Sequence, residues 1–341
     1  MTSSPHSKNF VLAWRGEYVE NRHFIHGAVC SRGGGLTASL GDSRRETFIR
    51  SSAKPLQAAA VLISGAADRY GLSAAEVSLI CASHSGEPEH VQAAKSLMER
   101  LGLEEHHLHC GTHEPYAKAA REALRAAGQP PTVLHHNCSG KHLGMLAMAK
   151  ALSVPLDGYW LPEHPVQQRM LAAVSELSGV PADLLTTATD GCGVPTYRMP
   201  LEQLARAYLA WCAPQSAADT PLAASCRTIY DSIVRHPFYL AGSGRFDTKL
   251  AEITSGRWIA KMGADGVLAM ASREAGFAVA LKCDDGSLQA VYAAGVEVLL
   301  QLEELSSSQA AALAAFHKPK LYNQAGLAIG RIEPDISLRR S

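Results

Sequence analysis

Short apolar runs separated by glycine and polar positions occupy residues 10–40, and this pattern predicts antiparallel β-strands at the start of the chain. Apolar positions at helical spacing then dominate the middle of the sequence. They predict helices over residues 54–64, 90–101, 116–127, 139–152, 166–177, 201–211 and 222–234. A short apolar run at 77–82 is expected to form a strand that ends in a polar loop, residues 83–87.

Strand-like patterns return in the last third of the chain. They cover residues 258–262, 267–271 and 277–283, and helical patterns follow near 289–302 and 307–316. Strands at both ends of a chain with a helical middle are typical of one sheet built from the two termini. We therefore expect an α/β fold in which an antiparallel sheet from about 10–50 and 255–341 carries packed helices, with a mostly helical insert at about 85–240. Residues 1–341 are expected to form a single catalytic unit.

The composition favours a folded protein that acts on small molecules. The 341 residues are 47% hydrophobic and 19% charged, which excludes a disordered or fibrous chain. Lys and Arg total 32, as do Asp and Glu, so there is no excess of positive charge to bind a nucleic-acid backbone. No apolar run reaches the roughly 20 residues that a membrane span requires. We expect neither a nucleic-acid partner nor membrane association.

The cysteines and the first residues bear on the compartment. The eight cysteines are spread along the chain without CxxC pairs, and the first fifteen residues contain only a five-residue apolar run, residues 10–14. In a reducing compartment such cysteines are core thiols, metal ligands or nucleophiles, and the apolar run is too short for a secretory signal. A cytoplasmic location is expected.

The segment Ser51-Ser52-Ala53-Lys54-Pro55 has the residue types of a serine nucleophile with a lysine base. Pro55 predicts a helix start at residues 51–54, because proline is tolerated only in the first helical turn. Ser51 and Lys54 then share a face, where the amine can reach the hydroxyl and the helix N-terminus favours a developing alkoxide. The alternative is an ordinary N-cap serine beside a solvated lysine.

Three further loops contain candidate groups. The segments Ser83-His84-Ser85-Gly86-Glu87 and Lys261-Met262-Gly263-Ala264-Asp265-Gly266 complete the order S-x-x-K, S-x-S, K-x-G, which favours a shared site. The second segment resembles the Lys-x-Gly element of active-site serine acyltransferases. Taken alone, each is equally a turn with loop hydrogen bonds and a surface lysine. Residues 242–248 add Arg245, either a clamp for a substrate carboxylate or a structural ion-pair partner.

Thiols, a carboxylate and imidazoles gather in two segments, His136-Asn137-Cys138-Ser139-Gly140-Lys141-His142 and Thr189-Asp190-Gly191-Cys192-Gly193. Such groups can bind zinc, although the spacings C-x-x-K and D-x-C differ from the paired CxxC of common zinc sites. In the alternative interpretation Ser139 caps the following helix, and Cys138 and Cys192 are buried thiols.

Together these motifs resemble the class 3, or rhizobial-type, bacterial L-asparaginase family, which is unrelated to the threonine-dependent asparaginases. The matching segments are Arg50-Ser51-Ser52-Ala53-Lys54-Pro55, Cys81-Ala82-Ser83-His84-Ser85-Gly86-Glu87, His136-Asn137-Cys138-Ser139-Gly140-Lys141-His142, Thr189-Asp190-Gly191-Cys192-Gly193-Val194-Pro195, Gly244-Arg245-Phe246-Asp247 and Lys261-Met262-Gly263-Ala264-Asp265-Gly266. They occur in family order, and the ends of the chain also fit, so the resemblance covers nearly the whole chain.

The resemblance implies a fold like that of serine β-lactamases and penicillin-binding proteins, and hydrolysis of L-asparagine to L-aspartate and ammonia. The implied catalytic residues are Ser51 as nucleophile with Lys54 as its base, and Ser83 with Lys261 as a second pair. Zinc held by Cys138, Lys141 and Cys192 is implied to position the substrate and not to activate water. The residues implied to bind the substrate are Arg50, His142, Asp190, Arg245, Gly263 and Asp265. A homodimer is implied as well.

Two other functions stay open on the residues alone. A β-lactamase-like or peptidase-like serine acyltransferase shares the SxxK and Lys-x-Gly elements. A zinc-stabilised protein that binds a small molecule would show no turnover. Release of ammonia from asparagine distinguishes these alternatives from an asparaginase.

Overall fold

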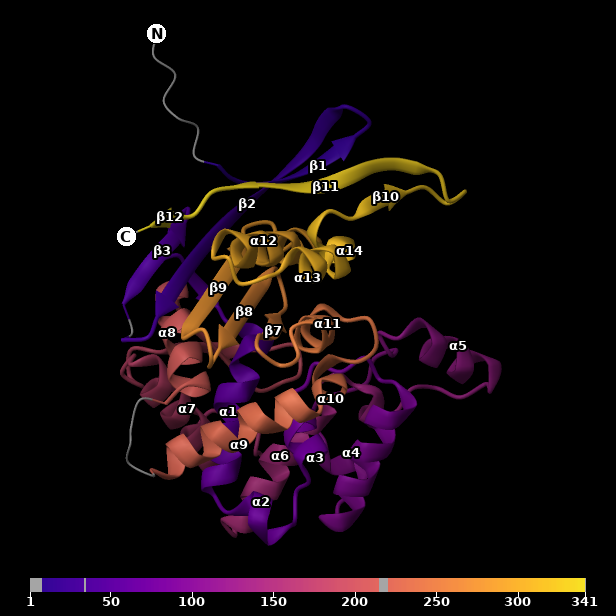
Figure 1. The fold of residues 1–341 in the computed structure, drawn as a ribbon. Helices are drawn as coiled ribbons and strands as arrows, with labels where there is room; N and C mark the ends of the chain where they lie inside the picture. The colour runs from indigo at the N-terminus through magenta and orange to yellow at the C-terminus, as the bar shows by residue number, and fades with distance from the viewer. Residues whose placement is uncertain (1–7, 34, 215–219, 341) are drawn as a thin grey trace.

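The computed structural model describes residues 8–33, 35–214 and 220–340, and its main sheet is built from both ends of the chain (Figure 1). The N-terminal strands are β1 (Asn9–Arg15), β2 (Tyr18–Ser31) and β3 (Leu36–Leu40); the later ones are β7 (Ile259–Gly263), β8 (Val267–Ser272), β9 (Phe277–Cys283), β10 (Lys320–Tyr322), β11 (Ala328–Ile336) and β12 (Arg339–Arg340). The order is β10-β11-β1-β2-β9-β8-β7, with β3 paired to β2 and to β12. All these pairings are antiparallel, so the predicted fold class is confirmed.

The sheet is covered on both faces because its central strands carry apolar side chains on both sides. Along β9, Ala278 and Ala280 belong to one hydrophobic core, whereas Val279 and Leu281 belong to the other. Helix α8 (Leu201–Cys212) packs on β2, β8 and β9, on the face of the first core, and α12 (Leu288–Gln301) packs on the other face. The site described below lies on the α8 side, where the sheet meets the helical region.

The helical middle of the chain agrees with the prediction in most elements. Its helices are α1 (Lys54–Ile63), α2 (Ala66–Arg69), α3 (Ala74–Ile80), α4 (Pro88–Arg100), α5 (Lys118–Ala126), α6 (Ser139–Ala151), α7 (Pro165–Ser178), α9 (Pro221–Arg235), α10 (Pro237–Ala241) and α11 (Phe246–Ile253). Two short helices, α13 (Ser307–Ala312) and α14 (Ala314–His317), stand where one was expected. Residues 54–61 of α1 are all buried, so this helix is the centre of the helical region. Lys54 therefore needs polar partners inside the protein.

The expected strand at 77–82 is wrong, because this apolar run lies mostly in α3. Ser73 starts the helix: its hydroxyl accepts a hydrogen bond from the backbone N–H of Glu76, and the Glu76 carboxylate accepts one from the N–H of Ser73. This reciprocal capping box fixes a helix start where the length of the apolar run alone favoured a strand.

The structure has a second sheet of three strands, which the sequence pattern did not predict. It consists of β4 (Glu46–Phe48), β6 (Pro195–Pro200) and β5 (Thr186–Thr189), in that order. Because β4 pairs with β6, the chain enters residues 50–53 directly beside the segment that contains Asp190 and Cys192. The small sheet thus joins two motifs that are far apart in the sequence.

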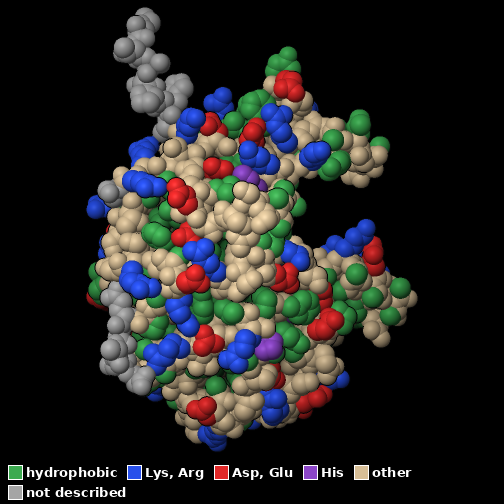
Figure 2. Space-filling view, viewed as in Figure 1, with side chains coloured by type: hydrophobic (Ala, Val, Ile, Leu, Met, Phe, Trp, Pro, Cys, Tyr) green, Lys and Arg blue, Asp and Glu red, His purple; other side chains and the backbone are tan. Residues whose placement is uncertain are grey.

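The surface agrees with the balanced composition. Figure 2 shows Lys and Arg side chains interspersed with Asp and Glu over the viewed face, and a hollow between the β10–β11 arm and α5. No helix in the described part of the chain combines the length and the apolar character needed to cross a lipid bilayer.

Candidate active site

Ser51 lies in a single turn of 3₁₀-helix, Arg50–Ala53, that continues directly into α1. The turn is fixed at its start, where the backbone N–H of Ile49 donates to Tyr197 O at 2.9 Å and the Ser52 hydroxyl donates to Ile49 O at 2.6 Å. Ser51 is 8% exposed, and its hydroxyl has no hydrogen-bond partner among the described residues. This hydroxyl is therefore free to meet a substrate.

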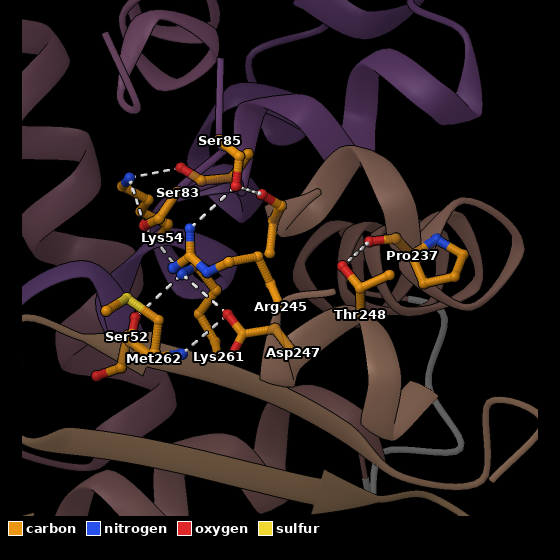
Figure 3. Close-up of polar contacts among 12 residues, drawn as sticks. Ser52, Lys54, Ser83, Ser85, Pro237, Arg245, Asp247, Thr248, Lys261 and Met262 are labelled. Carbon is orange, nitrogen blue, oxygen red and sulfur yellow. Dashed lines mark hydrogen bonds and ion pairs between the residues drawn. The ribbon is translucent and has the colours of Figure 1, made fainter. Parts of the chain in front are cut away.

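Ser83 is the meeting point of the two lysines. Its Oγ lies 3.0 Å from Lys54 Nζ and 3.0 Å from Lys261 Nζ (Figure 3). Lys54 also donates to Ala82 O, and Lys261 donates to Met262 O at 3.0 Å. The i, i+3 spacing predicted that Lys54 reaches Ser51, but the amine is hydrogen-bonded to Ser83. The structure thus brings together three of the four predicted catalytic side chains directly, with Ser51 at the start of the helix that carries Lys54.

The loop that carries Ser83 is tied to two other parts of the helical region. The backbone N–H of Ser83 donates to Leu240 O at 3.0 Å, and the Ser85 hydroxyl donates to Ala241 O at 2.8 Å, both at the end of α10. The N–H of His84 donates to Asn137 O at 3.3 Å, just before α6. These bonds fix the position of the Ser83 loop, so that the Ser83 hydroxyl stays next to Lys54 of α1.

Lys261 is completely buried, and the carboxylate of Asp247 lies next to it. Asp247 Oδ2 is 3.5 Å from Lys261 Nζ, and both side chains have at most 1% exposure. Burial lowers the pKa of Lys261 to about 7; the Lys54 charge acts in the same direction, and Asp247 acts against it. Lys261 can therefore exchange a proton near neutral pH. In the sequence, Asp247 was part of the motif Gly244-Arg245-Phe246-Asp247, but only Arg245 of that motif was given a role.

Three of the predicted substrate-binding residues form one ion-pair group beside Ser51. Arg50 Nε donates to Asp190 Oδ1 at 2.8 Å, and Arg50 also pairs with Asp265. Arg50 and Asp265 both have positive φ, 50° and 59°, which costs energy for residues other than glycine and is common at functional sites. A Cβ on Gly263 would lie 2.7 Å from Ile49 O, so glycine is required for β7 to approach the Ser51 turn.

Arg245 is hydrogen-bonded to the loop that carries Ser83. Its Nη1 donates to Ser85 Oγ at 3.2 Å, and its guanidinium lies over the Tyr116 ring, 5.6 Å from the ring centroid. The predicted alternatives for Arg245 were a substrate clamp and a structural partner. The contacts of Arg245 are a hydrogen bond and a cation–π contact, not an ion pair. The role as a substrate clamp stays a prediction.

The predicted metal ligands also come together. Cys138, Lys141 and Cys192 are each 4% exposed, and Lys141 Nζ lies 3.0 Å from Cys192 Sγ. A hydrogen bond from Cys138, together with the Lys141 charge, holds the pKa of Cys192 well below its usual range, although burial opposes this. Burial lowers the pKa of Lys141, but the nearby negative charges, first that of Cys192, outweigh burial and raise it. Without an ion, the cluster is an ammonium–thiolate pair with a neutral thiol.

His142, predicted to bind substrate, is fully buried next to this cluster. Its Nδ1 is hydrogen-bonded to the Tyr159 hydroxyl at 2.6 Å, whereas its Nε2 is buried with no hydrogen-bond partner among the described residues. Burial lowers the pKa of His142 to about 4, and the neighbouring Cys192 acts in the opposite direction. The imidazole is neutral and interacts with Cys192.

The alternative interpretation expected Ser139 to cap α6, and this expectation is wrong. The N-cap position is Cys138, which makes no side-chain capping bond. The Ser139 hydroxyl instead donates to Leu134 O at 3.1 Å and lies 2.9 Å from His84 Nε2. Burial lowers the pKa of His84 well below its usual range, so it is a neutral hydrogen-bonding partner in the Ser83 loop.

A separate group of metal-compatible side chains lies at the end of β9. The ligand atoms of His23, Cys283 and Asp285 are all within 4.8 Å of one another. Asp285 already accepts a hydrogen bond from Cys283 at 3.0 Å and is bonded to His23 at 2.6 Å. These three side chains satisfy one another, in contrast to the unpartnered nitrogen of His142.

Comparison with known protein families assigns the chain. The sequence profile of the family described as L-asparaginase II matches residues 11–334. The chain therefore belongs to the L-asparaginase II family. It is an L-asparaginase, an amidohydrolase that acts on L-asparagine, in agreement with the activity expected from its motifs. The search of curated protein sequences found no match.

Solved structures similar to this chain include β-lactamases at low sequence identity. A β-lactamase from Mycobacterium bovis is 15% identical, with 86% of this chain and 94% of that chain covered and a TM-score of 0.41. A putative β-lactamase from Bacteroides dorei DSM 17855 is 12% identical, with 80% and 84% covered and a TM-score of 0.39. A protein named Mglu is 13% identical, with 82% and 60% covered and a TM-score of 0.45.

Proposed function

We propose that this L-asparaginase works through a covalent aspartyl ester on Ser51, served by Lys54, Ser83 and Lys261. The observation that carries the proposal is the Ser83 hydroxyl, which lies 3.0 Å from both lysine amines in a buried site. Two ammonium groups on one hydroxyl repel each other, so one amine is favoured to be neutral. Because the Ser83 hydroxyl contacts both amines, the remaining proton can move to Lys261 and leave Lys54 neutral.

In the first half of the reaction, Ser51 Oγ attacks the side-chain amide carbon of L-asparagine. Lys54, one helical turn away, accepts the hydroxyl proton; hydrogen bonds of this kind often form only when substrate is bound. Backbone N–H groups at the start of α1 are suited to the negative oxygen that develops. The carbon–nitrogen bond then breaks, and the proton passes from Lys54 by way of Ser83 and Lys261 to the amide nitrogen, which leaves as ammonia.

In the second half, a water molecule attacks the ester carbon. Lys261 and Ser83 accept the proton from water, and the ester bond breaks to release L-aspartate. The proton taken from water passes through the Ser83 hydroxyl to Lys54, and Lys54 gives it to Ser51 Oγ as the ester bond breaks, so the enzyme is regenerated with atoms and charge balanced. A lysine with a pKa of about 7 suits this role, because an effective acid–base group titrates near the working pH.

We propose that Arg50, Asp190 and Arg245 bind the charged α-groups of the substrate, with His142, Gly263 and Asp265 lining the same site. The free amino and carboxylate groups of asparagine match the paired carboxylate and guanidinium groups found beside Ser51. A glutamine side chain is one methylene longer and shifts its amide within this fixed frame. We expect kcat/KM for glutamine to be about 10–200-fold lower, measured as ammonia release.

We propose zinc as the resident metal, held by Cys138, Lys141 and Cys192. Two sulfurs and an amine converge there, and His142 Nε2 is a buried nitrogen without a partner, so the donor set fits a metal that prefers sulfur and nitrogen. The amine must be neutral to bind metal. When bound, zinc would supply a Lewis acid that helps to hold the substrate; the nucleophile remains Ser51.

We also propose that the chain acts as one catalytic unit, forms a homodimer and is located in the cytoplasm. The eight cysteines are all free and buried, as expected in a reducing compartment. Exposed apolar residues occur near two turns of the main sheet. Tyr18 begins β2 and is 82% exposed, whereas Tyr322 and Leu327 lie in the β10–β11 arm and are 60% and 65% exposed. Such residues suit a contact between copies. Light scattering should give about twice the chain mass of 36.3 kDa, and Leu327→Ser should lower that value if the arm contributes.

The nucleophile is tested by comparing Ser51→Ala with Ser83→Ala, two buried serines of the same site. Ser51→Ala should reduce kcat for asparagine by at least about 10³-fold, because the covalent route is lost. Ser83→Ala should lose less, since water can replace its hydroxyl between the lysines. A folded Ser51→Ala enzyme with wild-type kcat would contradict the proposal.

A further inference from the structure

Asp247 is a buried carboxylate next to Lys261 that the reaction as described does not use. It lies in the first turn of α11 and is 1% exposed. Its Oδ2 accepts the backbone N–H of Met262 at 3.1 Å and pairs with Lys261 Nζ at 3.5 Å (Figure 3). One carboxylate oxygen therefore holds both the strand backbone next to Lys261 and its amine.

The second oxygen of Asp247 indicates that the negative charge of this carboxylate has a role in the site. Asp247 Oδ1 is buried with no hydrogen-bond partner among the described residues. Burying a carboxylate costs free energy, and an unpartnered oxygen adds to that cost. A neutral asparagine would satisfy the Met262 N–H equally well, because it also has an oxygen acceptor. The contact with Met262 alone does not explain a carboxylate at this position, whereas the ion pair with Lys261 does.

Asp247 affects the pKa of Lys261 in competition with other ionisable groups around the amine. Ionisable groups that act on Lys261 or Asp247 are Lys54 in α1, Cys81 after α3, Cys138 before α6, Tyr208 in α8, Arg245 before α11 and Tyr292 in α12. Burial raises the pKa values of Cys81, Tyr208 and Tyr292, so these groups are neutral. Lys54 and Arg245 both act against a proton on Lys261, and Asp247 acts in favour of it.

We propose that Asp247 is a positioning residue for asparagine hydrolysis: its carboxylate holds the Lys261 amine at Ser83 and sets the pH at which that amine exchanges its proton. The proposal rests on the proposed role of Lys261 in proton transfer. Asp247 does not contact the reacting atoms, so it acts through Lys261 alone.

Removal of the charge has a defined consequence. In Asp247→Asn, Lys261 faces Lys54 and Arg245 without a compensating carboxylate, and its ammonium form becomes less stable. The rise of kcat with pH that belongs to Lys261 should then move to lower pH by at least about one unit. A weaker base is a poorer catalyst, so the maximal kcat should fall about 10-fold. KM should stay within about threefold of wild type, because no substrate contact is removed.

The experiment measures kcat and KM for asparagine from pH 5 to 10 in wild type, Asp247→Asn, Asp247→Glu and the matched control Thr248→Val. Thr248 is the next residue of α11, is equally buried and donates to Pro237 O at 3.2 Å, so its loss perturbs the helix without touching the charge. We expect a shift in Asp247→Asn alone. If Asp247→Asn does not fold, Asp247→Ser offers the same test with a smaller neutral side chain that can still accept the Met262 N–H.

Two outcomes overturn the proposal: a folded neutral variant whose profile rises at the wild-type pH, or an equal shift in Thr248→Val. Failure of the proposed function is separate and is detected with Lys261→Met. If Lys261→Met keeps the wild-type rise of kcat with pH, that rise does not belong to Lys261, and the proton-transfer role itself is wrong. If Lys261→Met loses the rise and Asp247→Asn leaves it in place, only the inference about Asp247 fails.

Discussion

Two buried lysines in this protein have pKa values shifted in opposite directions. Lys261 is fully buried beside the Ser83 hydroxyl and a second lysine, and its pKa is lowered to about 7, chiefly by burial. Lys141 is 4% exposed beside the Cys192 sulfur, whose negative charge raises its pKa although burial opposes it. Burial acts alike on both amines, so the difference comes from their partners. Lys261 is suited to exchange a proton near neutral pH, whereas Lys141 is held as the ion-pair partner of Cys192.

The largest expected effect comes from a substitution that removes base catalysis by Lys54, one of the two lysines in contact with Ser83. Lys54→Arg keeps a positive charge but cannot accept a proton at any pH at which the enzyme works, so kcat for asparagine should fall about 10²–10⁴-fold in a folded protein. The matched control is Lys118→Arg, an exposed lysine of α5 that pairs with Glu122 and should retain full activity. Turnover above roughly a tenth of wild type in Lys54→Arg would rule out base catalysis by Lys54.

The next effect concerns the pH dependence of the wild-type enzyme. Because burial lowers the pKa of Lys261 to about 7, the neutral amine is scarce below that pH and becomes abundant above it. Activity should therefore rise as the pH passes through about 7 and stay high toward alkaline pH. In Lys261→Arg this rise should disappear and kcat should fall about 100-fold. A flat wild-type profile between pH 6 and 9 would show that no such group limits turnover.

A smaller effect on turnover is expected when Cys138 or Cys192 is replaced. Cys138→Ser and Cys192→Ser should each lose bound zinc and raise KM about 10-fold, with a much smaller fall in kcat than Ser51→Ala shows. Cys226→Ser, a buried cysteine in α9, serves as the control that keeps the metal. Metal content and steady-state kinetics decide the outcome. Loss of kcat as complete as in Ser51→Ala would make the metal part of the chemistry, and wild-type protein without zinc would leave the two cysteines as structural thiols.

The smallest effect tests the close approach of β7 to the Ser51 turn. A Cβ in Gly263→Ala would lie 2.7 Å from Ile49 O and must displace one of the two segments, which should cost about 1–3 kcal/mol of unfolding free energy and lower kcat/KM several-fold. Gly191→Ala is the control, because a Cβ there meets nothing within 4 Å. Thermal unfolding and kinetics of both variants provide the measurement; equal behaviour of the two would argue against a tight contact.

The sequence predicted the chemistry of the site better than its contacts. Apolar periodicity was sufficient for most helices and for the sheet from both chain ends, because those patterns are local. The run at 77–82 was assigned wrongly because its outcome depends on the Ser73 capping box outside the run. The contact of Lys54 with Ser83 and the role of Asp247 depend on side-chain directions across separate elements, and spacing along the chain does not encode them.

The central claim is that asparagine hydrolysis passes through an ester on Ser51. The most direct measurement is acid quenching of the enzyme during turnover, followed by intact-mass and peptide mass spectrometry. Lys261→Arg is included because it slows the attack of water and should let the ester accumulate. We expect one aspartyl group on the peptide that contains Ser51, absent in Ser51→Ala. An aspartyl group on another residue, or an active enzyme with no adduct in either protein under single-turnover conditions, would contradict the account.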